Sequence, residues 1–208
     1  MKVEKLAKLE DAFLQEYPDG FDSPDLLAIG KKHKMGKMQE FVEAEFNEAA
    51  FTDVNKVFES FVKLISKASL VSVFEKTKFR NIAPTFTMEE RTLLVEGLKE
   101  FLYGDQATGF SMQVDVLTRY KMAKWPILTV LGLYMHPGEE VLVKPTTVKG
   151  ILKYFEVEDF TYTSKANYEF YAQYRQLVND IKEKASERLD VDNAAFCGFL
   201  MMSIQEPK

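Results

Sequence analysis

KWPILTVLGLYMHPGEEVLVKPTTVKG, residues 124–150, is the stretch of the chain that says most about its architecture. It opens with a run of apolar or small residues at 125–135. Pro126 suits the first turn of a helix, and the His-Pro-Gly at 136–138 is a strong stop, because the residue before a proline avoids the α conformation. A helix that is apolar on every side belongs at the centre of a bundle. We therefore predict a buried helix over residues 126–135.

A buried strand is the alternative for this run, because Ile127, Thr129 and Val130 favour extended structure. We prefer the helix, since the only other extended stretches, residues 141–143 and 159–162, are too short to build a sheet. A loop at residues 136–144 should then carry the chain outward. A second helix should begin at Pro145 and run to Tyr154. The apolar run at residues 194–202 has the same character, and we expect these two apolar helices to form the core.

Amphipathic helical patterns fill most of the remaining sequence. Thr87 and Glu90 fit a capping box, and Gly104-Asp105 should end one helix and cap the next. We expect caps at Ser164 and Asp190 for the last two helices, and a break at Gly36 between two earlier ones. The prediction is an all-α fold of about ten helices around two apolar central helices. We favour a single domain over residues 1–208, and the alternative is two lobes that divide near residue 104.

Composition favours a soluble cytoplasmic protein. Hydrophobic residues make up 46% of the 208 residues and charged residues 28%, which is an ordinary globular balance. The longest apolar run is about half of the roughly 20 residues that a membrane-spanning helix needs. Cys197 is the only cysteine, so no intramolecular disulfide can form and a reducing cytoplasm is the expected setting. The formal net charge of −5 argues against non-specific nucleic-acid binding by the whole molecule.

Signatures of catalysis are few, so we favour a protein that is not an enzyme, without catalytic residues or cofactors. Phosphate-binding glycine loops, nucleophile elbows and zinc-binding helices have no match in the sequence, and no metal is expected. His33 and His136 lie in unrelated contexts, and Cys197 sits in an apolar run typical of a buried thiol. The adjacent acids Glu139 and Glu140 are expected to be solvated, as such pairs usually are.

Two lysine-rich stretches are the candidate binding sites. The first is the start of the helix at Pro145, where free backbone amides, hydroxyls and lysines could hold an anion. The alternative there is an ordinary helix start. The tentative anion-binding residues are Lys144, Thr146, Thr147 and Lys149.

The second candidate is a nucleic-acid contact through Lys31, Lys32, Lys34 and Lys37, which crowd seven residues around His33. The following segment, Met38 to Ala49, carries four glutamates that would face phosphates badly. A solvated connection between helices is therefore the preferred interpretation of this cluster.

Several stretches resemble a family of uncharacterised bacterial proteins of about this length. The resemblance lies in residues 29–33, 74–79, 124–126, 143–150 and 192–196. It spans most of the chain and implies a single all-α unit, without implying a catalytic residue, cofactor or substrate.

The function expected from these observations is that of a non-enzymatic interaction or regulatory protein, with self-association as one route. The alternatives are a nucleic-acid-associated protein that uses the lysine clusters, and a protein that binds a small anion near Pro145. No membrane association is expected.

Overall fold

The computed structural model describes residues 1–189 and 191–204, and over these residues the fold is all-α. Five short 3₁₀ turns connect the helices, and no strand occurs in the described ranges. The predicted fold class is confirmed. The α-helices are α1 (Leu6–Glu16), α2 (Pro24–His33), α3 (Met35–Glu45), α4 (Val54–Lys67), α5 (Val73–Ile82), α6 (Met88–Tyr103), α7 (Gln106–Arg119), α8 (Trp125–Met135), α9 (Pro145–Tyr154), α10 (Tyr168–Lys182) and α11 (Asn193–Ile204).

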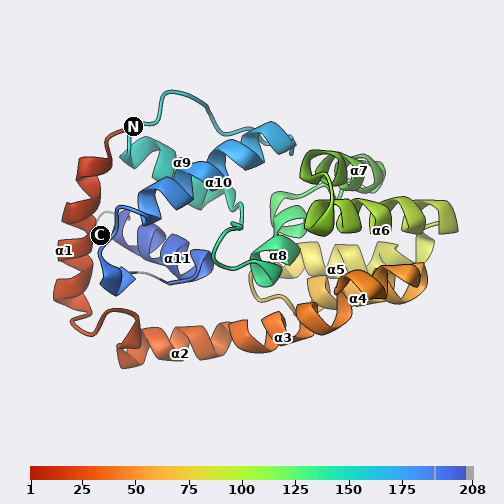
Figure 1. The fold of residues 1–208 in the computed structure, drawn as a ribbon, viewed down its shortest axis with the longest axis horizontal. Helices are drawn as coiled ribbons and strands as arrows, with labels where there is room; N and C mark the ends of the chain where they lie inside the picture. Colours follow the sequence, from red (N-terminus) through yellow and green to blue (C-terminus); the bar gives the residue numbers. More distant parts are fainter. Residues whose placement is uncertain (190, 205–208) are drawn as a thin grey trace.

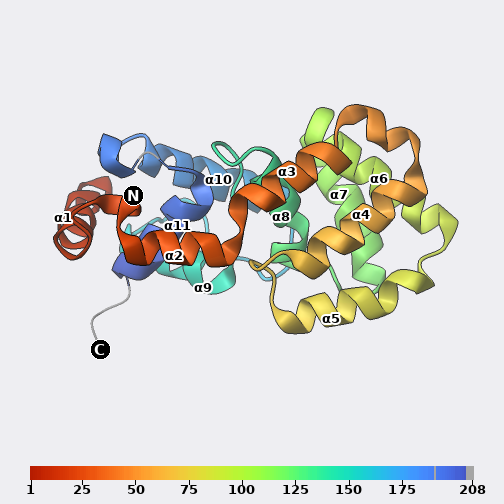
Figure 2. The ribbon, with the colours of Figure 1, turned by 90° about the horizontal axis from the view of Figure 1, so that it is seen from below.

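Helix α8 occupies the middle of the molecule. Figure 1 shows α1, α9, α10 and α11 on one side of it and α4 to α7 on the other, while α2 and α3 run along one edge. Figure 2, seen from below, keeps α8 between the same two groups. Direct contacts join α8 to α3, α4 and α7, and a single hydrophobic cluster runs through the described residues.

The prediction for the apolar run is confirmed, and the strand alternative is wrong. Nine of the eleven residues of α8 are buried. Thr129 is a buried polar residue of this helix. Its hydroxyl donates to the carbonyl of Trp125 (2.8 Å) and accepts from the amide of Val143 (3.1 Å). Because a buried hydroxyl without partners would be costly, these two bonds allow a threonine in the core.

The segment after α8 does not run outward as expected. Val141, Leu142 and Val143 are all buried, and the bond from Val143 to Thr129 ties them to α8. The predicted start of the next helix at Pro145 is correct, and α9 ends at Tyr154 as expected. Lys144, the residue before α9, therefore follows a buried and hydrogen-bonded stretch.

The second apolar helix, α11, packs against α1, α9 and α10. Phe196, Phe199 and Leu200 are buried, whereas Met201 is 39% exposed. The helix is therefore part of the core on one side and reaches the surface on the other, unlike α8.

Two of the predicted helix caps are present and one is wrong. The capping box of Thr87 with Glu90 is present, and the Asp105 carboxylate accepts from the amide of Thr108 (2.7 Å). Ser164 does not cap α10. That helix begins at Tyr168, directly after its cap Asn167, whose side-chain oxygen accepts from the amide of Phe170 (2.9 Å).

The break between α2 and α3 also lies elsewhere than predicted. It falls at Lys34, whose left-handed backbone (φ 54°) ends α2, while Gly36 lies inside α3. The predicted cap Asp190 lies outside the described residues. Beside the start of α11, the Asp192 carboxylate accepts from the amide of Ala195 (2.8 Å).

Candidate anion-binding site

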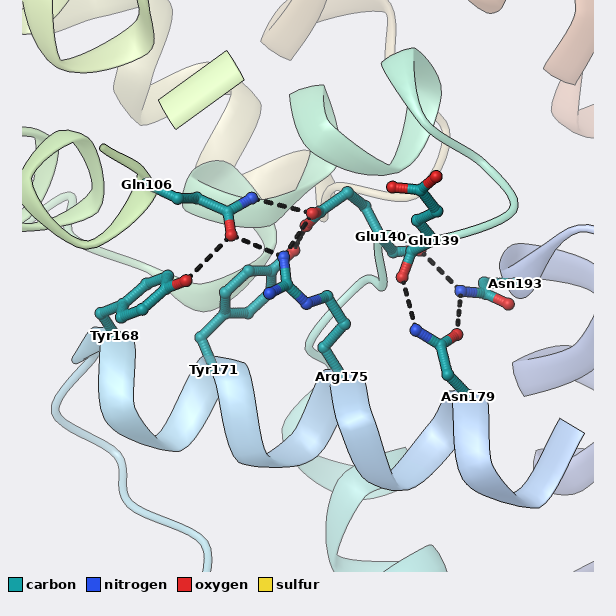
Figure 3. A network of polar contacts seen from close by, with 8 residues as sticks. All are labelled: Gln106, Glu139, Glu140, Tyr168, Tyr171, Arg175, Asn179 and Asn193. Carbon is teal, nitrogen blue, oxygen red and sulfur yellow. Dashed lines mark hydrogen bonds and ion pairs between the residues drawn. The ribbon is translucent and has the colours of Figure 1, made fainter. Parts of the chain in front are cut away.

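A buried polar network fixes the segment that leads to Lys144. The Glu140 carboxylate, 5% exposed, pairs with the Arg175 guanidinium at 2.5 Å. It also accepts from the Gln106 side-chain amide (2.8 Å) and from the Tyr171 hydroxyl. Figure 3 shows these side chains converging from α7, α10 and the segment between α8 and α9, with Tyr168 donating to Gln106 (2.9 Å).

The backbone of the same segment is held from α10 and α11. Asn179 donates to the carbonyl of Glu139 (2.9 Å), and Asn193 donates to the carbonyl of Glu140 (3.1 Å), as Figure 3 shows. The expectation that Glu139 and Glu140 form a solvated pair is wrong for Glu140, whose ionic partner lies 35 residues away in the chain. Burial and the neighbouring Glu140 raise the pKa of Tyr171 well above its ordinary value, so its hydroxyl remains a donor.

A hollow of about 530 Å³ opens beside the start of α9, and we call it the Lys144 hollow. Lys144, Pro145 and Thr146 line it, together with the half-buried ring of Tyr162 and the largely buried Trp125. Its volume lies within the range of ordinary ligand sites. The remaining lining residues are Ser69, Leu70, Val71, Ser72, Glu75, Lys124, Pro126 and Ser164.

Two of the four tentative anion-binding residues line this hollow, and two do not. Lys144 and Thr146 do. Thr147 is buried, and the Lys149 ammonium lies over the ring of Tyr162, 5.0 Å from its centroid. Neither Thr147 nor Lys149 lines the hollow.

A second hollow of about 440 Å³ gathers positive charge, and we call it the Lys37 hollow. Lys32, Lys34 and Lys37 of the predicted lysine cluster line it, whereas Lys31 does not. Two further lysines, Lys67 at the end of α4 and Lys76 in α5, complete the set of five. The other lining residues are His33, Met38, Phe41 and Ser69, so no carboxylate is among them.

Ser69 joins the two hollows and contacts His33. Ser69 lines both, and its hydroxyl lies 2.9 Å from Nδ1 of His33. Burial, followed by the charges of Lys144 and Lys32, lowers the pKa of His33. Lys144 of one hollow therefore lies close enough to His33 of the other hollow for its charge to affect the protonation of that ring.

The cations of both hollows lack acidic partners in the described part of the chain. None of the five lysines of the Lys37 hollow, nor Lys144, forms an ion pair with a described carboxylate. Burial lowers the pKa of both Lys76 and Lys144, because a partly desolvated ammonium loses hydration. Glu75, the one acid in the Lys144 hollow, accepts from the hydroxyl of Ser72 (2.8 Å) in a capping box.

Linear sequence patterns did not reveal the residues that other helices add to these hollows. Lys67, Ser69 and Lys76 lie far along the chain from both the lysine cluster and the helix start at Pro145, and no spacing connects them. Lys76 lies within residues 74–79, a stretch that carries the family resemblance, but the resemblance implies no role for it. Tertiary packing alone brings these residues together.

Other features of the chain are weaker candidates for a functional site. Burial raises the pKa of the Cys197 thiol to about 12, so this cysteine is not a thiolate at neutral pH. Within the described residues, no three His, Cys, Asp or Glu side chains are grouped so that they could hold a metal ion. None of the helices in residues 1–189 and 191–204 combines the length and hydropathy of a transmembrane span.

Comparison with known proteins gave no relative. No protein-family model, curated protein or solved structure matches the chain. The resemblance to a bacterial family stays a prediction.

Proposed function

We propose that this protein binds a phosphate-bearing anion across the Lys37 and Lys144 hollows. The observation that carries the proposal is the set of five lysines that line one hollow without a carboxylate among the lining residues. Clustered cations in a concave surface attract anions, because low-dielectric walls focus their field. Phosphate groups suit such a site, since lysine acts as a point charge toward them.

The adjoining Lys144 hollow extends the site. Lys144 follows a segment fixed by the Glu140 network, and Thr146 adds a hydroxyl in the first turn of α9. Backbone amides at a helix start favour anions. An extended ligand with several phosphates can therefore contact both hollows at once, through Ser69 at their junction.

This proposal selects one of the expected functions. Binding of an anion requires no catalytic group, in keeping with a non-enzymatic cytoplasmic role. The expectation of a protein-interaction module stays a prediction. The large apolar side chains exposed on the described helices are spread over four of these helices, which does not single out one interaction surface.

Calorimetric titration with inorganic tripolyphosphate tests the proposal. We expect the Lys32→Gln/Lys37→Gln variant to bind at least about tenfold more weakly than the parent protein, because two of the five lysine charges are lost. The matched control, Lys8→Gln/Lys99→Gln, removes the same charge from exposed positions of α1 and α6 and should bind like the parent. Equal losses in both variants, or no binding by the parent, would rule out a site in these hollows.

A further inference from the structure

Phe74 is an exception among the phenylalanines of this protein. All seventeen lie in the described part of the chain, and Phe74, at 89% exposure, is the one that is exposed. A single exposed apolar residue is ordinary on a protein surface. Its surroundings set this one apart.

Phe74 lies between residues that line the two hollows. Ser72 and Glu75 line the Lys144 hollow, and Lys76 lines the Lys37 hollow. Phe74 itself lines neither hollow. Side chains two residues apart on a helix point to different sides, so the ring of Phe74 lies on the solvent side of α5, where it shares a face with Lys78, four residues further along. The neighbouring Val73 is also exposed, which leaves the first turn of α5 uncovered within the described residues.

Cations continue along α5 beyond the hollows. Lys78 and Arg80 are exposed on the same helix, whereas Lys76 is half-buried. An aromatic face beside a basic groove is the combination by which proteins hold single-stranded nucleic acid: lysines follow the phosphates and rings stack on the bases. Stacking requires an unpaired base, because bases in a duplex are already stacked on one another.

We propose that the phosphates bound in the two hollows belong to a single-stranded nucleic acid, and that Phe74 stacks on one of its bases. This inference rests on the proposed function, and it adds the class of ligand. The charge of the hollows fits any polyanion, whereas an exposed ring on the helix that borders them, with Lys78 on the same face, suits a polyanion that also carries flat apolar groups.

Fluorescence anisotropy with a labelled single-stranded oligothymidylate tests this inference, with inorganic polyphosphate as the ligand that lacks bases. We expect Phe74→Ala to weaken oligothymidylate binding by about 5-fold to 150-fold, the range of one base–aromatic stack. Phe74→Tyr should bind like the parent, and Phe74→Ala should bind polyphosphate like the parent. The matched control is Met88→Ala, which truncates another exposed apolar residue at the start of a different helix.

The other outcomes separate the two proposals. If Phe74→Ala binds oligothymidylate like the parent while Lys32→Gln/Lys37→Gln loses it, the hollows hold phosphates and the stacking inference is overturned. If the parent binds neither oligothymidylate nor polyphosphate, the proposed function itself is overturned. Tighter, Phe74-independent binding of a duplex, or Phe74-dependent binding of polyglutamate as tight as that of oligothymidylate, would also overturn a single-stranded ligand.

Discussion

Among individual residues, His33 is the one through which the anion affinity of the proposed site should depend on pH. Its pKa is lowered by burial and by Lys144 and Lys32, so it is neutral at pH 7 in the free protein. A bound anion would favour the protonated ring and raise this pKa. Affinity should therefore increase as the pH falls from 7 toward the pKa of the free protein, which lies below the ordinary 6.5.

Inositol hexasulfate suits this measurement, because its sulfate groups keep their charge over the whole pH range. Titrations between about pH 5 and 8, the range in which a histidine changes its charge, should show tighter binding at low pH for the parent. The profile of His33→Gln should be flat. An equal pH dependence in both proteins would assign the proton to another group.

The ion pair of Glu140 with Arg175 allows a second prediction, which concerns the free energy of unfolding. Replacing Arg175 by methionine leaves a buried carboxylate without its cation, and breaking such a pair costs about 3–5 kcal/mol in free energy of unfolding. Urea denaturation measures this, with Arg80→Met, an exposed position of α5, as the control. A loss below about 1 kcal/mol in Arg175→Met, the size expected of an exposed pair, would show that the network does not hold the segment before Lys144.

Sequence patterns predict some residues well and others poorly, for physical reasons. Pro126 and Pro145 mark helix starts through their own ring geometry, so both starts were predictable. The environment of Glu140 depends on Arg175, and that of the lysine cluster on Lys67 and Lys76. Contacts of this kind are set by tertiary packing and produce no local pattern.

Among the helices, α8 lies in the middle of the fold (Figure 1) and packs directly on α3, α4 and α7. Its boundaries were predictable because local signals fix them, whereas the cap of α10 was not, since Ser164 and Asn167 have similar capping chemistry. The buried course of residues 141–143 does not follow from the sequence, because the side chains that hold this segment, among them Thr129 and Asn193, lie on other elements.

Leu131→Ala tests the central position of α8. Leu131 is buried, so its truncation should lower the free energy of unfolding by about 2–5 kcal/mol. Leu27→Ala, at an exposed position of α2, is the matched control and should change it by less than about 0.5 kcal/mol. Chemical denaturation that gave the two variants equal stability would contradict the place of α8 in the core.

For the molecule as a whole, a net charge of −5 coexists with a local set of five lysines. Binding of a polyanion must then depend on this local field and weaken steeply with salt. With about 0.7 counterions released per single-strand phosphate contact, the five lysines predict a slope of about −3 to −4 for log K against log salt. Lys32→Gln/Lys37→Gln should reduce the magnitude of that slope by about 1.4, and an unchanged slope would place the contacts elsewhere.

Locating the bound anion on the protein would test the proposed site without relying on any substitution. Amide chemical shifts, followed by NMR during a tripolyphosphate titration, report which residues sense the ligand. We predict that the largest changes fall at residues 32–37, 69, 76 and 144–146, in the segments that line the two hollows. Largest changes outside both hollows, or small changes spread evenly over the chain, would contradict an anion site there.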